Sequence, residues 1–459
     1  MAAVFDTAGE RHVSGASPLL AAAARDRIIA WRNGRGIRVS EFLDDIRKVA
    51  GQLPSAGCAI NLCEDRYGFI VAFCAVASKG QATLLPTSRA NQAIADVQSD
   101  HPGAYLVGDA SCCMDLPNLI RLPELGHPAF NEGAPVPMIE DARIVAIGFT
   151  SGSTGLPKPN TKSWGNFRLS SANNIDAIHA ATGLSAAQTT HVLATVPAQH
   201  MYGMEMSVLL PLFGNFAVHS GKAFFPADVA HSLAQMPEPR LLVTTPVHLR
   251  ALLHSAVELP SITAFISATA PLTAELANEV EQRFGAPVIE LFGSTETCVI
   301  AHRRTASESD WNLYPNVELV AQADGTRVEA SHLSQPTLLQ DILELRSRRR
   351  FRLQGRNADL LEIAGKRASL ADLTHRLLGL DGVLDAVVFQ VDADAGSPVR
   401  RIAALAVAPG RSEKELLGAM RKLIDPVFLP RPLRLVDALP RNETGKLPRQ
   451  ALISAISES

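Results

Sequence analysis

The chain has 459 residues, of which 47% are hydrophobic and 19% are charged, and its formal net charge is -3. This length exceeds what a single core organises and predicts two or three domains. The near-neutral charge excludes bulk attraction to nucleic acid. Six cysteines without C-x-x-C spacing are typical of a reducing compartment. No apolar run approaches the length of a membrane span, and acidic residues precede the first apolar run, so we expect a soluble cytoplasmic protein without membrane insertion.

The first 140 residues alternate between helical and strand patterns. Residues 40–50 place apolar side chains on one face of a helix, with Ser40 as the expected N-cap. Residues 67–78 predict an apolar helix, and residues 82–85 and 105–107 predict short strands. This alternation indicates α/β layering around a mainly parallel sheet. It does not indicate a function.

The stretch IVAIGFTSGSTGLPK, residues 144–158, joins a short buried strand to a loop of glycines and small hydroxyls. Glycine lacks a Cβ, so backbone N–H groups in such a loop can approach phosphate oxygens, and hydroxyls and a lysine add donors and charge. The loop is not a Walker motif, because Pro157 and Pro159 stand at two of its required positions. A simple polar turn is the alternative for this loop alone. The phosphate-binding candidates are Thr150, Ser151, Gly152, Ser153, Thr154, Gly155 and Lys158.

Further strands are predicted over residues 192–197, 241–249, 262–272 and 288–292. They end in small or turn residues, which is what a ligand crevice at the carboxyl edge of an α/β sheet requires. The first leads to His200; a lone histidine is more often a structural residue than a functional one. The others lead to short polar segments whose role this pattern does not specify.

Six segments in order identify a resemblance. FTSGSTGLPK, PAQHMYG, ATAPL, LFGSTE, GRNADLLEIAG and NETGK, spread over residues 149–446, are similar to the signature of the adenylate-forming superfamily. That superfamily includes acyl- and aryl-CoA synthetases, peptide-synthetase adenylation domains and firefly luciferase. Its reaction joins a carboxylate to the α-phosphate of ATP, releases pyrophosphate and then transfers the acyl group to a thiol. The wording QHMYGME most resembles the aryl-acid ligases of xanthomonadin and aryl-polyene pigment clusters.

The resemblance implies ATP and Mg²⁺ as cofactors and assigns residues to them. The loop from Thr150 to Lys158 would hold the β- and γ-phosphates. Thr295 would contact the α-phosphate, Glu296 would bind magnesium, and Lys446 would bridge the carboxylate and the α-phosphate. The remaining nucleotide contacts implied are Ala268, Thr269, Ala270, Pro271, Phe292, Gly293 and Ser294 around the adenine, and Asp341 and Arg356 at the ribose. Phe292 stands where the family usually has tyrosine, and the residues flanking Asp341 depart from the family's T-G-D motif.

The resemblance also implies two domains: an α/β N-terminal domain over residues 1–357 and a small mobile α+β C-terminal domain over residues 358–459. The hinge position holds Ala358, where the family usually has Asp or Lys. Alternating apolar residues between Asp341 and Arg356 predict a β-hairpin. Beyond the hinge, Ser369 and Asp372 predict a capping box that opens a helix ending near Leu380, followed by a strand over residues 386–389.

The acid pocket is expected between Val196, His200, Leu291 and Gly293. A histidine face beside a glycine suits a flat aryl acid, such as a hydroxybenzoate, better than a long chain. For the thiol, Glu362 replaces a lysine common in the family, which disfavours free CoA, and five arginines within residues 346–352 offer a landing patch for an acidic acyl carrier protein. The alternatives are a CoA ligase, an aryl-acid adenylase that forms a hydroxamate or amide after the same first step, and a non-catalytic nucleotide-binding scaffold. The retained Lys446, Glu296, Asp341 and Arg356 argue against the scaffold. The alternative for the arginine run is a solvated hairpin tip.

Overall fold

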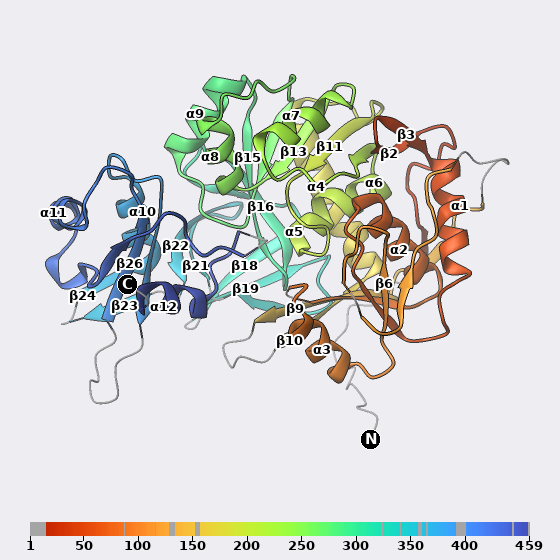
Figure 1. Ribbon diagram of the computed structural model, residues 1–459, viewed down its shortest axis with the longest axis horizontal. Coiled ribbons are helices and arrows are strands. Elements are labelled where there is room, and N and C mark those ends of the chain that lie inside the picture. The colour runs from red at the N-terminus through yellow and green to blue at the C-terminus, as the bar shows by residue number, and fades with distance from the viewer. Residues whose placement is uncertain are drawn as a thin grey trace. The chain divides into compact units, whose positions relative to one another are not determined.

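A computed structural model of the protein divides the chain into two compact units (Figure 1). Unit 1 comprises Met1–Val317 and Glu329–Thr337, and unit 2 comprises Glu318–Val328 and Leu338–Ser459. The structure describes residues 15–86, 88–114, 116–127, 134–151, 157–322, 325–339, 341–356, 360–363, 366–391, 401–442 and 445–457. For residues 151, 157, 355, 356, 360–363, 366 and 367 it describes the backbone alone.

The first sheet of unit 1 has the strand order β10-β9-β5-β4-β6-β7. Strands β7, β6, β4, β5 and β9 run parallel, and β10 returns antiparallel to β9. The strands are β4 (Cys58–Asn61), β5 (Ala82–Leu85), β6 (Tyr105–Gly108), β7 (Leu119–Arg121), β9 (Ile144–Ser151) and β10 (Pro157–Ser163), and the accompanying helices are α1 (Val39–Ala50), α2 (Arg66–Ser78) and α3 (Asn91–Asp100). Helix α2 is apolar on all sides and almost wholly buried, because it packs on β4 and β5 and also on β12 (Phe216–His219) of the second sheet.

The second sheet of unit 1 has the order β17-β16-β15-β14-β13-β11-β12-β2-β3. Its strands are β2 (Ile28–Arg32), β3 (Arg35–Arg38), β11 (Thr190–Ala194), β12, β13 (Arg240–Thr244), β14 (Ala264–Ser267), β15 (Val288–Ser294), β16 (Cys298–Arg304) and β17 (Trp311–Leu313). The five neighbouring strands β15, β14, β13, β11 and β12 are mutually parallel, so their carboxyl ends meet at one edge of the sheet. Helices α7 (Pro226–Ala234), α8 (Pro246–His254) and α9 (Ala274–Phe284) gather on one face of this sheet (Figure 1) and share one apolar core with it.

Between β11 and β12 the chain forms a nearly continuous buried helical stretch. It consists of α5 (Met201–Gly203), a π-helix (Met204–Leu209) and α6 (Leu210–Phe213). The long helix α4 (Trp164–Thr182) packs against it. Smaller elements complete the region before residue 340: the pair β1 (Ala16–Pro18) and β8 (Met138–Glu140), and the three-stranded sheet β18 (Val317–Gln322), β19 (Gly325–Ala330) and β20 (Thr337–Leu339).

Unit 2 has a core of its own. Helices α10 (Leu370–Leu378) and α11 (Glu413–Leu423) bury leucines and Met420 against a three-stranded sheet. The sheet consists of β25 (Asp385–Val391), β26 (Arg401–Val407) and β27 (Leu433–Leu435); the other elements are the hairpins β21 (Asp341–Ser347) with β22 (Arg350–Arg356) and β23 (Leu360–Ile363) with β24 (Lys366–Ser369), a 3-10 turn (Pro426–Phe428) and α12 (Arg449–Ser457). The predicted α/β fold with a smaller α+β C-terminal part is confirmed.

Most sequence-predicted elements are found, and three strand predictions are too long. The strand predicted over residues 241–249 ends at Thr244, and α8 begins at Pro246, because proline suits the first position of a helix. The strand predicted over residues 262–272 is limited to Ala264–Ser267. The strand predicted over residues 192–197 ends at Ala194.

Two capping predictions are wrong. Helix α1 begins at Val39, with Arg38 as its N-cap, and the Glu41 carboxylate accepts the Arg38 backbone N–H at 2.8 Å, so Ser40 lies inside the first turn. Ser369 does cap α10 by accepting from the Ala371 N–H at 3.2 Å. Asp372 does not complete a capping box; its carboxylate accepts instead from Arg376 at 2.8 Å.

The predicted domain boundary after residue 357 stays a prediction, since residues 357–359, with the hinge position Ala358, lie outside the described part of the chain. Among the described residues, no helix is long and apolar enough to cross a membrane.

Candidate active site

The phosphate-loop candidates begin where β9 and β10 pair. The antiparallel register sets Thr150 opposite Lys158, and Asn160 Nδ2 donates to Thr150 Oγ1 at 3.4 Å. Lys158 is exposed. The loop residues Gly152, Ser153, Thr154 and Gly155 lie outside the described residues, as does the side chain of Ser151. The hairpin therefore brings the two ends of the predicted phosphate loop together.

The turn between β15 and β16 carries Thr295 and Glu296. It is closed by reciprocal bonds: Ser294 N donates to Thr297 Oγ1 at 3.1 Å, and Thr297 N donates to Ser294 Oγ at 3.2 Å. A Cβ at Gly293 would lie 2.2 Å from the Cys298 carbonyl oxygen, so this position admits only glycine, and the strand register shifts beside it. The bulge lets the chain turn sharply and present Thr295 and Glu296, both partly exposed.

Three predicted motifs meet at Gly148 of β9. A Cβ at this position would lie 2.9 Å from Thr295 Cγ2 and 3.3 Å from Met201 Cε. Gly148 belongs to the strand that opens into the phosphate loop, Thr295 to the β15–β16 turn and Met201 to the segment that contains His200. The fold thus juxtaposes segments that are more than 50 residues apart in sequence, as the resemblance implied.

The predicted acid-binding segment follows β11. Val196 is buried, and the backbone carbonyls of Ala194 and Val196 accept from Arg66 Nη2 at 3.2 and 2.6 Å. Arg66 is itself fully buried at the start of α2, and burial lowers its pKa to about 10. His200 is half-buried and immediately precedes α5. Arg66 therefore fixes the strand end from which the histidine segment departs.

The other wall of the predicted pocket lies at the ends of β14 and β15. Ala268 is buried, Thr269 has a φ of +79° that is unusual for a residue with a Cβ, and Pro271 is exposed. Ala270 is half-buried. Tyr202 spans the gap from the histidine segment, because its hydroxyl donates to the Ile266 carbonyl at 2.7 Å just before this turn.

The predicted adenine and acid contacts on β15 alternate in burial. Leu291 is buried, whereas Phe292 is half-buried and its ring lies 5.3 Å from that of Trp311, tilted by 49°. The same Trp311 carries the Arg303 guanidinium over its ring at 4.3 Å. Phe292 is thus an aromatic side chain supported from one side and partly open to solvent.

Unit 2 holds the predicted ribose residues and the predicted catalytic lysine. The hairpin register sets Asp341 opposite Arg356, which confirms the predicted hairpin and puts the two residues side by side on neighbouring strands. Lys446 is exposed, and its N–H donates to Asn442 Oδ1 at 2.9 Å. Arg441 braces this turn by donating to the Gly445 carbonyl at 2.8 Å while forming an ion pair with Asp385 at 2.9 Å. The lysine therefore stands on an anchored turn.

A comparison with known families settles the class. Residues 48–329 match the model of the family described as AMP-binding enzyme, which is more than half of the chain. The chain belongs to this family. The predicted superfamily is therefore confirmed, and the AMP-binding enzyme described here is an AMP-forming acid–thiol ligase.

Named relatives agree with the class of this AMP-binding enzyme. The chain is 29% identical to a 4-coumarate–CoA ligase of Halorhodospira halophila over 307 residues, which is 65% of this chain and 73% of the relative. It is 24% identical to a sulfoacetate–CoA ligase of Cupriavidus necator over 388 residues, 74% of each chain.

Solved structures share the fold. O-succinylbenzoate coenzyme A synthetase (MenE) from Bacillus subtilis, in complex with ATP and magnesium, superposes with a TM-score of 0.79 at 19% identity over 95% of this chain and 99% of that one. The anthranilate CoA ligase AuaEII, in complex with anthranoyl-AMP, gives 0.78 at 15% identity over 95% of each chain.

A magnesium ion would find its ligands on the AMP-binding enzyme's turn and on the nucleotide. Among the described residues, no group of three or more His, Cys, Asp or Glu side chains could hold a metal by itself. Mg²⁺ is usually bound through one or two carboxylates together with substrate phosphates and water. A single, partly exposed carboxylate such as Glu296 fits that chemistry.

Sequence reasoning missed three buried residues beneath the β15–β16 turn: Lys162, Glu205 and His332. Lys162 Nζ donates to the Glu296 carbonyl at 2.6 Å, and His332 Nε2 is 2.9 Å from the Thr297 carbonyl. The Glu205 carboxylate accepts the Val299 N–H at 3.1 Å. A carboxylate inside the apolar run MEMSVLL was a visible signal for Glu205, and a lysine among inward-facing strand positions was one for Lys162.

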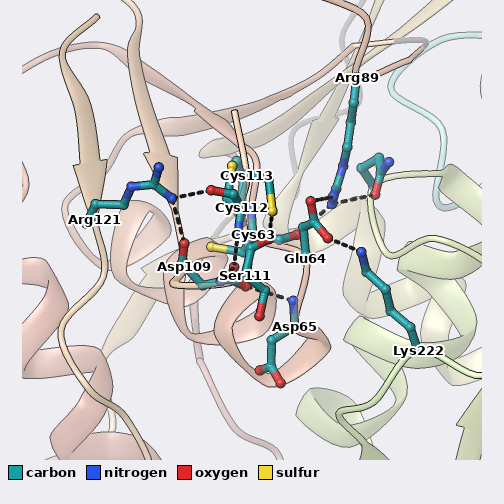
Figure 2. A network of polar contacts seen from close by, with 12 residues as sticks. Cys63, Glu64, Asp65, Arg89, Asp109, Ser111, Cys112, Cys113, Arg121 and Lys222 are labelled. Carbon is teal, nitrogen blue, oxygen red and sulfur yellow. Dashed lines mark hydrogen bonds and ion pairs between the residues drawn. The ribbon is translucent and has the colours of Figure 1, made fainter. Parts of the chain in front are cut away.

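A second missed network lies at the carboxyl ends of β4 and β6 (Figure 2). Glu64 pairs with Lys222 and, at 3.9 Å, with Arg89. Arg89 also donates to Gln199 Oε1 at 3.2 Å, directly before His200. This network connects the first sheet of the AMP-binding enzyme to the predicted acid-binding segment.

At the centre of Figure 2, Asp109 accepts the backbone N–H groups of Asp65, Ser111 and Cys112 at 2.7 to 3.0 Å. Burial raises the pKa of this carboxyl, and these bonds oppose the rise. Arg121 donates to the Asp109 backbone carbonyl at 2.9 Å. Because both carboxylate oxygens of Asp109 already accept backbone N–H groups, the Asp109 cluster is a brace for the loops after β4 and β6.

Proposed function

We propose that this enzyme activates an aryl carboxylic acid, most directly a hydroxybenzoate, as its acyl-adenylate and transfers the acyl group to the phosphopantetheine thiol of an acyl carrier protein. The observation that carries the adenylation site is the meeting of the phosphate-loop strand, the Thr295 turn and the His200 segment around Gly148. Relatives named for 4-coumarate and indoleacetate, and a fold neighbour named for anthranilate, support an aromatic acid.

The first chemical step has an electrostatic barrier, since a carboxylate must approach the α-phosphate of ATP. Donors and positive charge around that phosphate stabilise the transition state. Thr150 to Lys158 would bind the outer phosphates, and Thr295 the α-phosphate. Glu296 would bind magnesium, which supplies charge neutralisation on the phosphates. Lys446 would supply the mobile positive charge between the two reacting groups.

Nucleotide selection is assigned to two groups of residues. Asp341 would accept the ribose hydroxyls with Arg356 beside it. Phe292 and the segment 268–271 would enclose the adenine, with Gly293 and Ser294 as backbone contacts. In this proposal residues 1–357 form the substrate-binding domain, and residues 358–459 form a mobile domain that brings Lys446 for adenylation and withdraws it for thiol transfer.

The acid pocket is assigned to Val196, His200, Leu291 and Gly293. Buried aliphatic side chains together with a half-buried imidazole would suit the flat face of a benzoate, and the glycine would leave room for the carboxylate to approach the turn. The Arg66 contact with the Val196 carbonyl and the Arg89 contact with Gln199 both fix the chain just before His200, which favours a rigid acid over a flexible chain.

The carrier protein is proposed from the surface of the β21–β22 hairpin. Exposed arginines crowd its tip, where Arg346 pairs with Glu344 at 2.8 Å and Arg348 with Glu318 at 3.4 Å. Two apolar side chains that flank the arginine run in sequence, Leu345 and Leu353, are 47% and 40% exposed. A basic surface with apolar anchors is complementary to the acidic helices of carrier proteins. The QHMYGME resemblance to ligases of pigment clusters points the same way.

Free CoA is the second candidate acceptor, and it is favoured by the names of the relatives, all of which are CoA ligases.

Acid specificity is tested by acid-dependent exchange of pyrophosphate into ATP over hydroxybenzoates, cinnamates and fatty acids. Preference for a fatty acid over every aryl acid would overturn the pocket assignment. The acceptor is then tested by acyl transfer to CoA and to a holo carrier protein at low and high salt. Salt-sensitive transfer to the carrier is expected; efficient, salt-insensitive transfer to CoA alone would overturn it.

A further inference from the structure

Three buried, hydrogen-bonding side chains hold the turn that carries Thr295 and Glu296. They are Lys162, Glu205 and His332, with exposures of 4%, 1% and 1%. Each contacts a different backbone group of the turn or its exit: the Glu296 carbonyl, the Val299 N–H and the Thr297 carbonyl. Burial and the nearby Lys162 charge lower the pKa of His332 to about 4, so this imidazole is neutral.

Lys162 lies near the end of β10, a few residues after the phosphate-loop candidates. Its ammonium donates at 2.6 Å to the carbonyl of Glu296, the proposed magnesium ligand. Because the Glu296 side chain is attached to this backbone, the contact also restricts where the Glu296 carboxylate can lie. Burial raises the pKa of the Cys298 thiol to about 12, and the nearby Lys162 charge opposes that rise. The lysine is therefore close to the turn at both Glu296 and Cys298.

Glu205 lies in the π-helix that directly follows the His200 segment. Its carboxylate accepts from Ser170 Oγ at 2.7 Å, from Asn174 Nδ2 at 3.2 Å and from the Val299 N–H at 3.1 Å. Burial raises the pKa of this carboxyl, while those bonds and Lys162 oppose the rise. Single-turn π-helical insertions are frequent at functional sites. Glu205 therefore ties the helix that begins at the acid-binding segment to the strand that leaves the nucleotide turn.

Stability alone is a weak reason for these two charges. Both lie in the interior, where a charge costs free energy unless it is paired or hydrogen-bonded, and replacing buried charges of opposite sign together with apolar residues of similar volume is often neutral or stabilising. What two apolar side chains cannot reproduce is the pair of directional contacts, one to the Glu296 carbonyl and one to the Val299 N–H. These contacts constrain the two ends of the turn.

We propose that Lys162 and Glu205 are positioning residues that hold the Thr295–Glu296 turn in its reactive geometry and couple it mechanically to the acid-binding segment. The inference rests on the proposed adenylation site. It assigns neither residue to the substrates themselves. A displacement of about 1 Å at a reacting group can reduce the rate about 100-fold, so loss of either contact should act on turnover much more than on folding.

The test uses three full-length variants: Lys162→Met, Glu205→Met and the double variant. Acid-dependent pyrophosphate exchange gives kcat and the KM values for acid and Mg-ATP, and thermal unfolding reports stability. For Lys162→Met we expect kcat to fall by about 10- to 100-fold, together with a higher magnesium requirement. The double variant should regain thermal stability, because no uncompensated charge remains, yet its kcat should stay low.

Lys79→Met is the matched control, since Lys79 Nζ also donates to a backbone carbonyl, that of Leu53 at 3.1 Å, in a loop remote from the turn. A double variant that regains both stability and kcat would overturn the proposal, as would Lys162→Met losing no more activity than Lys79→Met. If Lys162→Met does not fold, the double variant alone decides. Failure of the proposed function gives a different result, because the wild-type enzyme would then show no pyrophosphate exchange with any acid. In that case the turn is tested by calorimetry of Mg-ATP binding. We expect the double variant to bind Mg-ATP more weakly than Lys79→Met does, and equal binding would overturn the proposal.

Discussion

Gly148→Ala offers a test of whether the position of Thr295 limits adenylation. The added Cβ would lie 2.9 Å from Thr295 Cγ2. Carbon atoms in ordinary contact are about 3.5–4.0 Å apart, so the threonine side chain must retreat by about 0.6–1.1 Å. The second contact, with Met201 Cε at 3.3 Å, is relieved more easily because a methionine side chain is flexible.

A displacement of Thr295 by that distance has a small effect on the stability of the fold and a large effect on the rate of the reaction. Overpacking a well-packed position costs about 1–3 kcal/mol of stability, an amount that a domain of this size tolerates. A misplacement of about 1 Å at a catalytic group can cost about 100-fold in rate. We therefore expect Gly148→Ala to remain folded and to lose about 10- to 100-fold in acid-dependent pyrophosphate exchange.

The clashing atom can be removed separately. Serine lacks the Cγ2 methyl of threonine but keeps the hydroxyl, so Thr295→Ser should relieve the contact with an alanine at position 148. The double variant is expected to recover most of the exchange seen with Thr295→Ser alone. Gly418→Ala is the control, because a Cβ there meets no atom within 4 Å in a helix of unit 2. Wild-type exchange by Gly148→Ala, or no recovery in the double variant, would refute this reasoning.

Three further predictions follow. Lys446→Ala should reduce pyrophosphate exchange by about 10²–10³, the usual effect of one preorganised donor, with little change in the unfolding temperature; unchanged exchange would remove Lys446 from the mechanism. His200→Ala should raise the KM for an aryl acid far more than that for Mg-ATP, measured in the same assay, and equal effects on both would contradict the pocket. Burial and the nearby Arg240 lower the pKa of His191 from 6.5 to about 4. Between pH 6.5 and about pH 4, His191 therefore binds a proton in the unfolded chain but not in the folded chain. The free energy of unfolding consequently falls as the pH falls through this range. Urea unfolding of His191→Gln, whose amide can still accept from Trp31 Nε1, should show a shallower loss, by at most about 1.4 kcal/mol per pH unit; an unchanged slope would exclude His191 as a source.

The local sequence pattern predicted a strand correctly where the burial of that strand depends on the sheet to which it belongs. The apolar runs of β5 and β9 predicted buried parallel strands, and the alternation of Leu343 and Leu345 with charged residues predicted the β21–β22 hairpin. The run at 241–249 misled because its apolar content continues across the strand end. The information was present in Pro246, which marks the first turn of a helix.

The supports of the candidate site could not be predicted because their partners are distant in sequence. Lys162 and Glu296 are 134 residues apart, and Glu205 and Val299 are 94 apart. Composition marks a charged residue in an apolar run as unusual, but it does not say which backbone group will satisfy the charge. The same holds for Arg66, whose fully buried guanidinium is explained only by the carbonyls at the end of β11.

The arrangement of these supports separates two kinds of change in acid specificity. Val196 and His200 belong to the proposed pocket, whereas Lys162, Glu205 and His332 hold the nucleotide turn. Substitutions there can reshape the pocket and leave the turn in place. Glu205, only five positions beyond His200, carries the turn through Val299, so altering it changes the geometry of adenylation for every acid. Selection for a new aryl acid should therefore accumulate changes before the π-helix and preserve Glu205 within it.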